Sequence, residues 1–88
     1  MSKEETRVAV IGIVLEDRTS VEKLNLLLQE YANVILGRMG LPYRDKNISL
    51  MSIFIDAPQD TISTLTGKIG NLENISVKTA YSNVISHE

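Results

Sequence analysis

The sequence contains no cysteine and no tryptophan, and it has one histidine, one phenylalanine and two prolines among 88 residues. Without cysteine, a disulfide framework, an iron–sulfur cluster, a thiolate metal site and a cysteine nucleophile are all excluded. The lone histidine, His87, lies one residue from the end of the chain. A Ser-His-Asp arrangement is therefore not expected, because it needs a buried and oriented imidazole.

Other catalytic and metal-binding patterns are also missing. Glu16 and Asp17 form a carboxylate pair, but Arg18 follows directly, which favours a solvated turn over an acid–base pair. No histidine spacing suits zinc, and no repeated Asp-x-Asp pattern suits a hard cation. We expect no catalytic residue, no metal site and no cofactor.

The sequence also lacks a large excess of charge of one sign and a long apolar run. Nine basic and eleven acidic residues give a net charge of −2, which does not favour direct binding to nucleic acid or to an anionic membrane. No segment approaches the ~18 apolar residues of a membrane-spanning helix. The expected location is the cytoplasm, and the apolar content of 43% is ordinary for a globular protein.

Hydrophobic periodicity predicts four strands and two helices. A helix over 19–33 begins with a capping-box pattern at Thr19 and Glu22, and a second helix runs from about Pro58 to Leu72. Strands are expected where β-branched residues are dense or alternate with polar ones, over 7–15, 34–41, 48–56 and 75–81.

The order strand–helix–strand–strand–helix–strand predicts an α+β fold of the ferredoxin-like βαββαβ type. In this arrangement a four-stranded antiparallel sheet carries both helices on one face. Right-handed crossovers then place the first and third strands in the centre. The length allows a single domain over 1–88, with a core of about 7–82 and tails at 1–6 and 83–88.

The strands carry more apolar residues than a sheet covered on one face requires, because large aliphatic side chains occupy both faces of the first and third strands. The face opposite the helices is expected to expose roughly six to eight of them, more than soluble monomers usually tolerate. Alternation in the second strand groups Ile35 with Met39 and Leu41. We expect a homo-oligomer, a dimer or a tetramer, joined through the open sheet face; the alternative is that the tail or loops cover it.

A glycine-arginine segment, Gly37-Arg38-Met39-Gly40, interrupts the second strand. A GxxG turn clamps RNA in KH domains, but there it joins two helices, whereas here it lies within a strand. The glycines permit either a β-bulge or the close approach of a ligand to backbone amides. Together with Tyr43 and Arg44, Arg38 suits an anion or carboxylates across a subunit boundary.

This segment, Ile35–Arg44, together with Val8–Ile13 and Leu65–Gly70, resembles the iron-only hydrogenase system regulators over about residues 7–82. The resemblance implies a stand-alone ACT-like domain, similar in fold to the regulatory domain of the nickel-responsive repressor. The histidine and cysteine metal ligands of that domain have no counterpart here, and no catalytic residues come with the family. The motif positions of the family are all present, as Gly37, Arg38, Met39, Gly40, Pro42, Tyr43 and Arg44.

The resemblance further implies a non-enzymatic domain, linked to the [FeFe]-hydrogenase system, that senses a small-molecule effector. Because ACT-like domains bind effectors at subunit boundaries, the expected site lies near Gly37–Arg44 and the start of the first helix. The alternative is a structural or adaptor subunit that binds a partner protein without a ligand. That alternative predicts a co-purifying partner and no small-molecule pocket.

Overall fold

The computed structural model describes the backbone of residues 5–16 and 18–87, and the side chains of these residues as far as Asn83. Asp17 of the predicted carboxylate pair therefore lies outside the described residues. The elements in chain order are β1 (Glu5–Leu15), α1 (Val21–Glu30), β2 (Ile35–Tyr43), the 3-10 turn η1 (Arg44–Lys46), β3 (Ile48–Ala57), α2 (Gln59–Gly70) and β4 (Ile75–His87).

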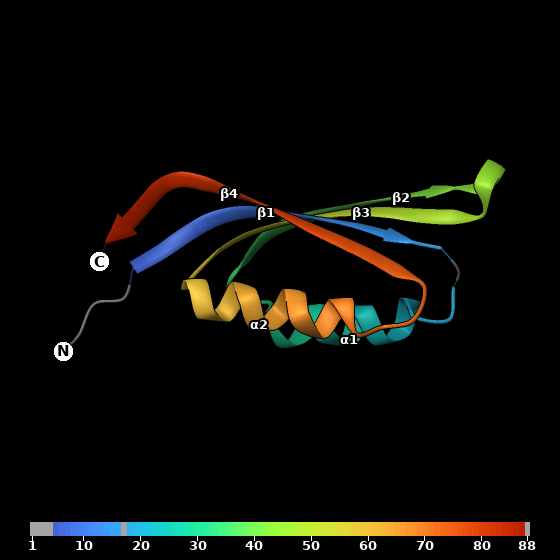
Figure 1. Ribbon diagram of the computed structural model, residues 1–88, viewed down its shortest axis with the longest axis horizontal. Helices are drawn as coiled ribbons and strands as arrows, with labels where there is room; N and C mark the ends of the chain where they lie inside the picture. Colours follow the sequence, from blue (N-terminus) through green and yellow to red (C-terminus); the bar gives the residue numbers. More distant parts are fainter. Residues whose placement is uncertain (1–4, 17, 88) are drawn as a thin grey trace.

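The sheet has the strand order β2-β3-β1-β4, and each neighbouring pair is antiparallel. Both helices lie on the same side of the sheet (Figure 1). The predicted ferredoxin-like βαββαβ fold is confirmed, with the first and third strands in the centre.

The core lies between the sheet and the two helices. Alternate residues of a strand share a face, so one face of β1 and β3 supplies a continuous apolar layer. Leu24 and Leu28 of α1 and Ile62, Leu65 and Ile69 of α2 recur at three- and four-residue spacing and pack against that layer. The buried residues of the layer are Ala9, Ile11, Ile13, Leu15, Ile53, Ile55 and Ala57.

A cation–π contact joins the two helices at their solvent side. The Nζ atom of Lys68 in α2 lies 5.3 Å from the centroid of the Tyr31 ring, which follows α1. A side-chain hydrogen bond with Tyr31 is the main cause that raises the pKa of Lys68 above its usual value. Lys68 is therefore held in its charged form beside the ring.

The start of α1 differs from the predicted capping box. The helix begins at Val21, and Ser20 rather than Thr19 occupies the N-cap position without making a cap hydrogen bond. The Ser20 hydroxyl instead donates to the carbonyl oxygen of Glu73, 53 residues away, over 2.9 Å. Ser20 is only 3% exposed, so this bond ties the start of α1 to the loop between α2 and β4. A local sequence pattern cannot show such a distant partner.

We expect Ser20→Ala to lower the free energy of unfolding by about 1 kcal/mol, because the Glu73 carbonyl loses its buried donor. Urea unfolding followed by circular dichroism measures this change. Thr64→Ala, at an exposed position of α2, is the control and should change the free energy by less than about 0.5 kcal/mol. An equal loss in both variants would contradict the role assigned to Ser20.

The first and last strands are longer than predicted. Residues 5–6 and 83–87, expected to be tails, are strand, because Glu5 pairs with His87 and Arg7 with Ile85. Each segment gives the other its backbone hydrogen-bond partners, which neither sequence segment reveals alone. The chain end thus continues the sheet instead of folding over its open face.

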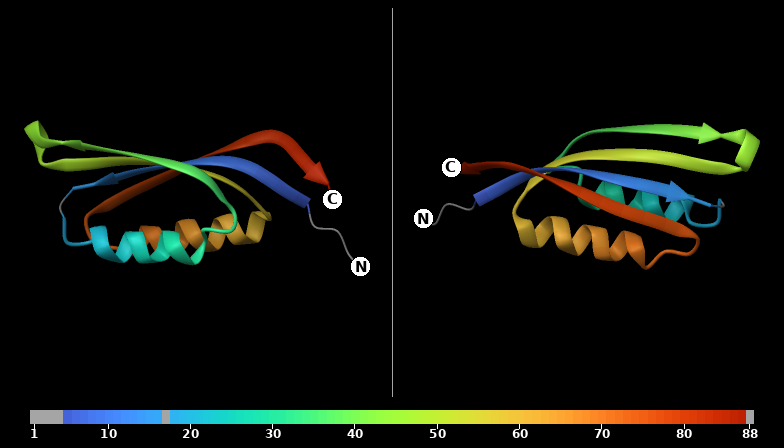
Figure 2. Two further views of the ribbon diagram at one scale, coloured as in Figure 1. Left: turned by 180° about the vertical axis from the view of Figure 1, so that it is seen from behind. Right: turned by 45° about the horizontal axis from the view of Figure 1, so that its top comes forward.

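The lengths of the elements decide which parts of the sheet are covered. Helices of 10 and 12 residues span about 15–18 Å, whereas strands of 11 and 13 residues span about 36–43 Å. The molecule is accordingly elongated, with extents of 49 × 20 × 17 Å. Both ends of the sheet project beyond the helices (Figure 2), so the helices do not cover the side chains at these ends.

Candidate functional site

The sheet face turned away from the helices carries no covering element in the described part of the chain (Figures 1 and 2). Met39 and Leu41 on this face are 67% and 61% exposed. The second apolar face predicted from the sequence is therefore present, and the C-terminal segment as far as His87 continues β4 instead of covering it. The cross-strand register places on it the large apolar side chains of Val8, Val10, Val14, Met39, Leu41, Ile48, Leu50 and Phe54.

A register shift in β2 decides which of its residues reach the open face. Ile35 lies on the helix-facing side, but the pairing shifts between Ile35 and Gly37, so that Leu36 is an extra residue. Simple alternation, which grouped Ile35 with Met39 and Leu41, is therefore wrong, because the extra residue moves the latter two to the open face. Of the two roles that the glycines of Gly37–Gly40 permit, a β-bulge or the close approach of a ligand, this register shift is the first.

The open face is hollowed above Gly12 of β1. The hollow has a volume of about 610 Å³, and its walls include Leu41 from β2, Leu50 from β3 and Lys78 from β4. A Cβ atom at Gly12 would meet only the Lys78 carbonyl oxygen, at an ordinary 3.8 Å. Packing within one chain therefore does not require glycine here, and the hollow is a surface feature of the open face.

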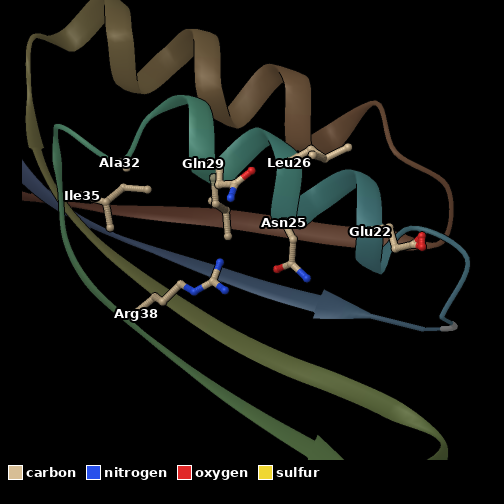
Figure 3. A pocket seen from close by; sticks show the side chains of 8 residues that line it. Glu22, Asn25, Leu26, Gln29, Ala32, Ile35 and Arg38 are labelled. Carbon is tan, nitrogen blue, oxygen red and sulfur yellow. The ribbon is translucent and has the colours of Figure 1, made fainter.

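A groove of about 700 Å³ lies on the other side of the sheet, between α1 and the edge strand β2 (Figure 3). Arg38 reaches from β2 toward α1, where Asn25 and Gln29 present their amides one turn apart (Figure 3). One guanidinium and two amides above an apolar base can hold a small polar molecule with an anionic group at Arg38. The groove is lined by Glu22, Asn25, Leu26, Leu28, Gln29, Ala32, Ile35 and Arg38.

A smaller cavity of about 300 Å³ lies at the end of the sheet where the β2–β3 hairpin projects beyond the start of α1. Arg18, from the turn before α1, and Arg44, from η1, both contribute to its lining. The complete lining is Leu15, Arg18, Pro42, Tyr43, Arg44, Asn47, Ile48 and Ser49.

The arginine side chains differ in how they are engaged. Arg7 donates through Nη1 to Oε1 of Gln59 over 2.9 Å and through Nη2 to the Ser82 carbonyl oxygen over 3.0 Å. Its guanidinium also lies 4.7 Å from the centroid of the Tyr81 ring. The side chain of Arg7 is therefore engaged in contacts that stabilise the fold at the end of the sheet where β1 begins. The arginines whose side chains have no hydrogen-bond or ion-pair partner among the described residues are Arg18, Arg38 and Arg44.

The predicted site segment does not converge on one place. Arg38 lines the groove beside α1, Met39 and Gly40 line the hollow of the open face, and Pro42–Arg44 line the cavity at the hairpin end. Sequence reasoning missed Asn25 and Gln29, whose four-residue spacing on the polar side of the helix was the available signal. Gly37 contacts none of these hollows and lies beside the register shift.

Among the described residues, no group of three or more histidine, cysteine, aspartate or glutamate side chains is placed to hold a metal ion. Within the same residues, no helix is long and apolar enough to cross a membrane.

The fold defines a small α+β domain of the ferredoxin-like class, with an uncovered apolar sheet face and separate hollows lined by arginine. The chain belongs to the TM1266-like family. The model of that family, described as "Iron-only hydrogenase system regulator, putative", matches residues 7–79, which confirms the resemblance seen in the sequence.

Solved structures agree with this assignment. The uncharacterized protein TM1266 from Thermotoga maritima superposes with a TM-score of 0.83 at 34% sequence identity, over 86% of this chain and 96% of that chain. The apo form of CPII from Thiomonas intermedia K12, a nitrogen regulatory PII-like protein, superposes with a TM-score of 0.58 over 99% of each chain. Its identity of 11% shows a shared fold alone. A comparison with curated proteins gives no match.

Proposed function

We propose that the protein is a cytoplasmic, non-enzymatic ACT-like regulatory domain of the [FeFe]-hydrogenase system. It works as a homo-oligomer, a dimer or a tetramer, joined through the open sheet face, and it senses a small-molecule effector. The observation that carries this proposal is the uncovered apolar face of β1, β2 and β3. Each 100 Å² of apolar surface hidden there contributes about 2.5 kcal/mol before the costs of association.

The effector is proposed to bind in the groove between α1 and β2, with its anionic group at Arg38. Support comes from the guanidinium of Arg38, which has no hydrogen-bond or ion-pair partner among the described residues, and from the amides of Asn25 and Gln29 that face it (Figure 3). The residues proposed from the sequence as ligand-binding or interface residues are Gly37, Arg38, Met39, Gly40, Pro42, Tyr43 and Arg44. Of these, Arg38 lines the groove, and Met39 and Gly40 line the hollow of the open face.

Strand β2 connects effector binding with self-association. Arg38 lines the groove, whereas its neighbour Met39 lies on the open face. An effector and a partner subunit would therefore contact opposite sides of the same edge strand. A ligand that favours one position of β2 changes the affinity of the subunits for each other, and self-association changes the affinity for the ligand by the same factor.

Ligand binding in the groove is tested by measuring the Tm of the protein with each member of a panel of phosphate- and carboxylate-bearing metabolites. A ligand at ~100 times its Kd stabilises the folded state by about 2.7 kcal/mol, which raises the Tm of a domain this small by on the order of 10 °C. We expect Arg38→Ala to abolish that rise, because the groove loses its only cation. Lys23→Ala, which removes a cation from an exposed position of α1 outside the three hollows, should retain it.

Two results would contradict the proposal. If no member of the panel raises the Tm, the sensing function is wrong. If the wild-type chain is also monomeric by light scattering, the proposal of a ligand-sensing homo-oligomer is replaced by the alternative, an adaptor that binds a partner protein without a ligand.

A further inference from the structure

Two arginines line the cavity at the hairpin end. They are Arg18 and Arg44, and the described residues that line the cavity include no carboxylate, although Glu16 and Asp45 are close to them in the sequence. The whole chain has eleven acidic residues and a net charge of −2, so carboxylates are not scarce. Guanidinium groups near each other repel unless an anion lies between them.

We propose that this cavity binds a small organic dianion, carrying a phosphate group or two carboxylates, with Arg18 and Arg44 as its charged ligands. This site uses a different cavity and different arginines from the groove. It therefore depends neither on the effector site at Arg38 nor on self-association through the open face.

The fold itself places the two arginines at one end of the molecule, although 26 positions separate them in the sequence. Strand β1 ends at Leu15, opposite Ser49 of β3, so the β2–β3 hairpin extends beyond it. The turn that carries Arg18 and the turn that carries Arg44 then face the same cavity.

The backbone at Arg44 is well defined. Arg44 begins η1, and its carbonyl oxygen accepts a hydrogen bond from the Asn47 amide over 3.1 Å. Asn47 closes the turn with a φ of 57°, in the left-handed region that asparagine tolerates better than most residues. The guanidinium therefore starts from a fixed turn, which reduces the ordering cost of binding.

The remaining lining completes the chemistry of a dianion site. The Asn47 amide and the Ser49 hydroxyl are neutral donors on the wall of the cavity. Two guanidinium forks match the paired oxygens of phosphate or carboxylate groups. Tyr43, which is 42% exposed, offers apolar surface to a carbon skeleton. The volume of about 300 Å³ is at the lower end of small-molecule sites, which favours a compact organic anion.

The test compares inorganic phosphate, succinate and chloride at equal ionic strength, with the full chain as the protein. We expect phosphate or succinate to raise the Tm above its value in chloride, and the anion that does so distinguishes phosphate from dicarboxylate recognition. Nitrogen–proton NMR spectra of the wild-type chain should show saturable shifts at Arg18, Arg44 and Asn47. This second measurement needs no variant to fold.

Variants with matched charge changes separate a site from a general charge effect. Arg18→Gln and Arg44→Gln should each weaken anion binding about ten-fold or more, because each removes one fork. Lys23→Gln makes the same charge change at an exposed position of α1 that lines none of the three hollows, and it should bind the anion as the wild type does. The proposal is overturned if neither anion exceeds chloride, or if all three variants weaken binding equally. Light scattering in the same buffers reports self-association separately, so either proposal can fail alone.

Discussion

Leu41→Lys is expected to convert the proposed oligomer into a monomer without unfolding the chain. Leu41 is 61% exposed on the open face, so a lysine there remains solvated in a single subunit and costs little. In the proposed assembly the same ammonium would be buried against apolar side chains, at several kcal/mol per ion. A two-fold interface contains each substitution twice. We therefore expect the dissociation constant to rise by about a thousand-fold or more.

Sedimentation velocity at micromolar concentration measures this change, and the chain offers a closely matched control. Leu26 is 63% exposed but lies on α1, away from the open face. Leu26→Lys makes the same chemical change on a comparable surface and should leave the association state unchanged. A wild-type chain that sediments as a monomer, or an equal effect of both variants, would show that the open face is not the interface.

The fold could be predicted because its determinants are local or periodic. Strand β1 is a dense run of valine and isoleucine, and the stripe of Ile62, Leu65 and Ile69 in α2 repeats every three or four residues. Each pattern identifies an element without reference to the rest of the chain. The order of the elements, with the handedness of crossovers, then fixes the positions of the strands in the sheet.

Features that depend on distant partners could not be predicted in this way. Ser20 fits a helix start in the sequence, but the Glu73 carbonyl determines what its hydroxyl does. The strand segment from Glu5 exists because β4 continues to His87. The residues that flank Ser20 and Glu5 in the sequence do not identify these partners. Sequence patterns therefore predict β1 and β4 to be shorter than they are.

The residues that the sequence proposes as one site do not lie together in the structure. The segment Gly37–Arg44 was identified as a unit, but a strand sends successive side chains to opposite faces. Arg38 and Met39 are neighbours in the sequence, yet they line hollows on opposite sides of the sheet. Sequence contiguity therefore suggested one site, where the structure separates a groove, an open face and a cavity at the hairpin end.

Ile11→Ala is expected to lower the free energy of unfolding by about 3–4 kcal/mol. Ile11 is 0% exposed and lies on the central strand β1, between Ile53 of β3 and Thr79 of β4. Removing its outer carbons leaves a cavity that neighbours on both sides cannot fill, and such changes typically cost 2–5 kcal/mol. A domain of 88 residues is stable by roughly 4–13 kcal/mol in total, so this single change removes a large share of its stability.

Val10→Ala on the same strand is the control, because Val10 is 38% exposed on the opposite face. Both changes should be compared in the Leu41→Lys background, so that loss of an interface is not counted as loss of folding stability. Urea unfolding should then show a cost below about 1 kcal/mol for Val10→Ala, because its side chain already contacts water in the monomer. Equal costs at the two positions would mean that the two faces of β1 are buried alike within one subunit. The open face could then no longer support the proposed assembly.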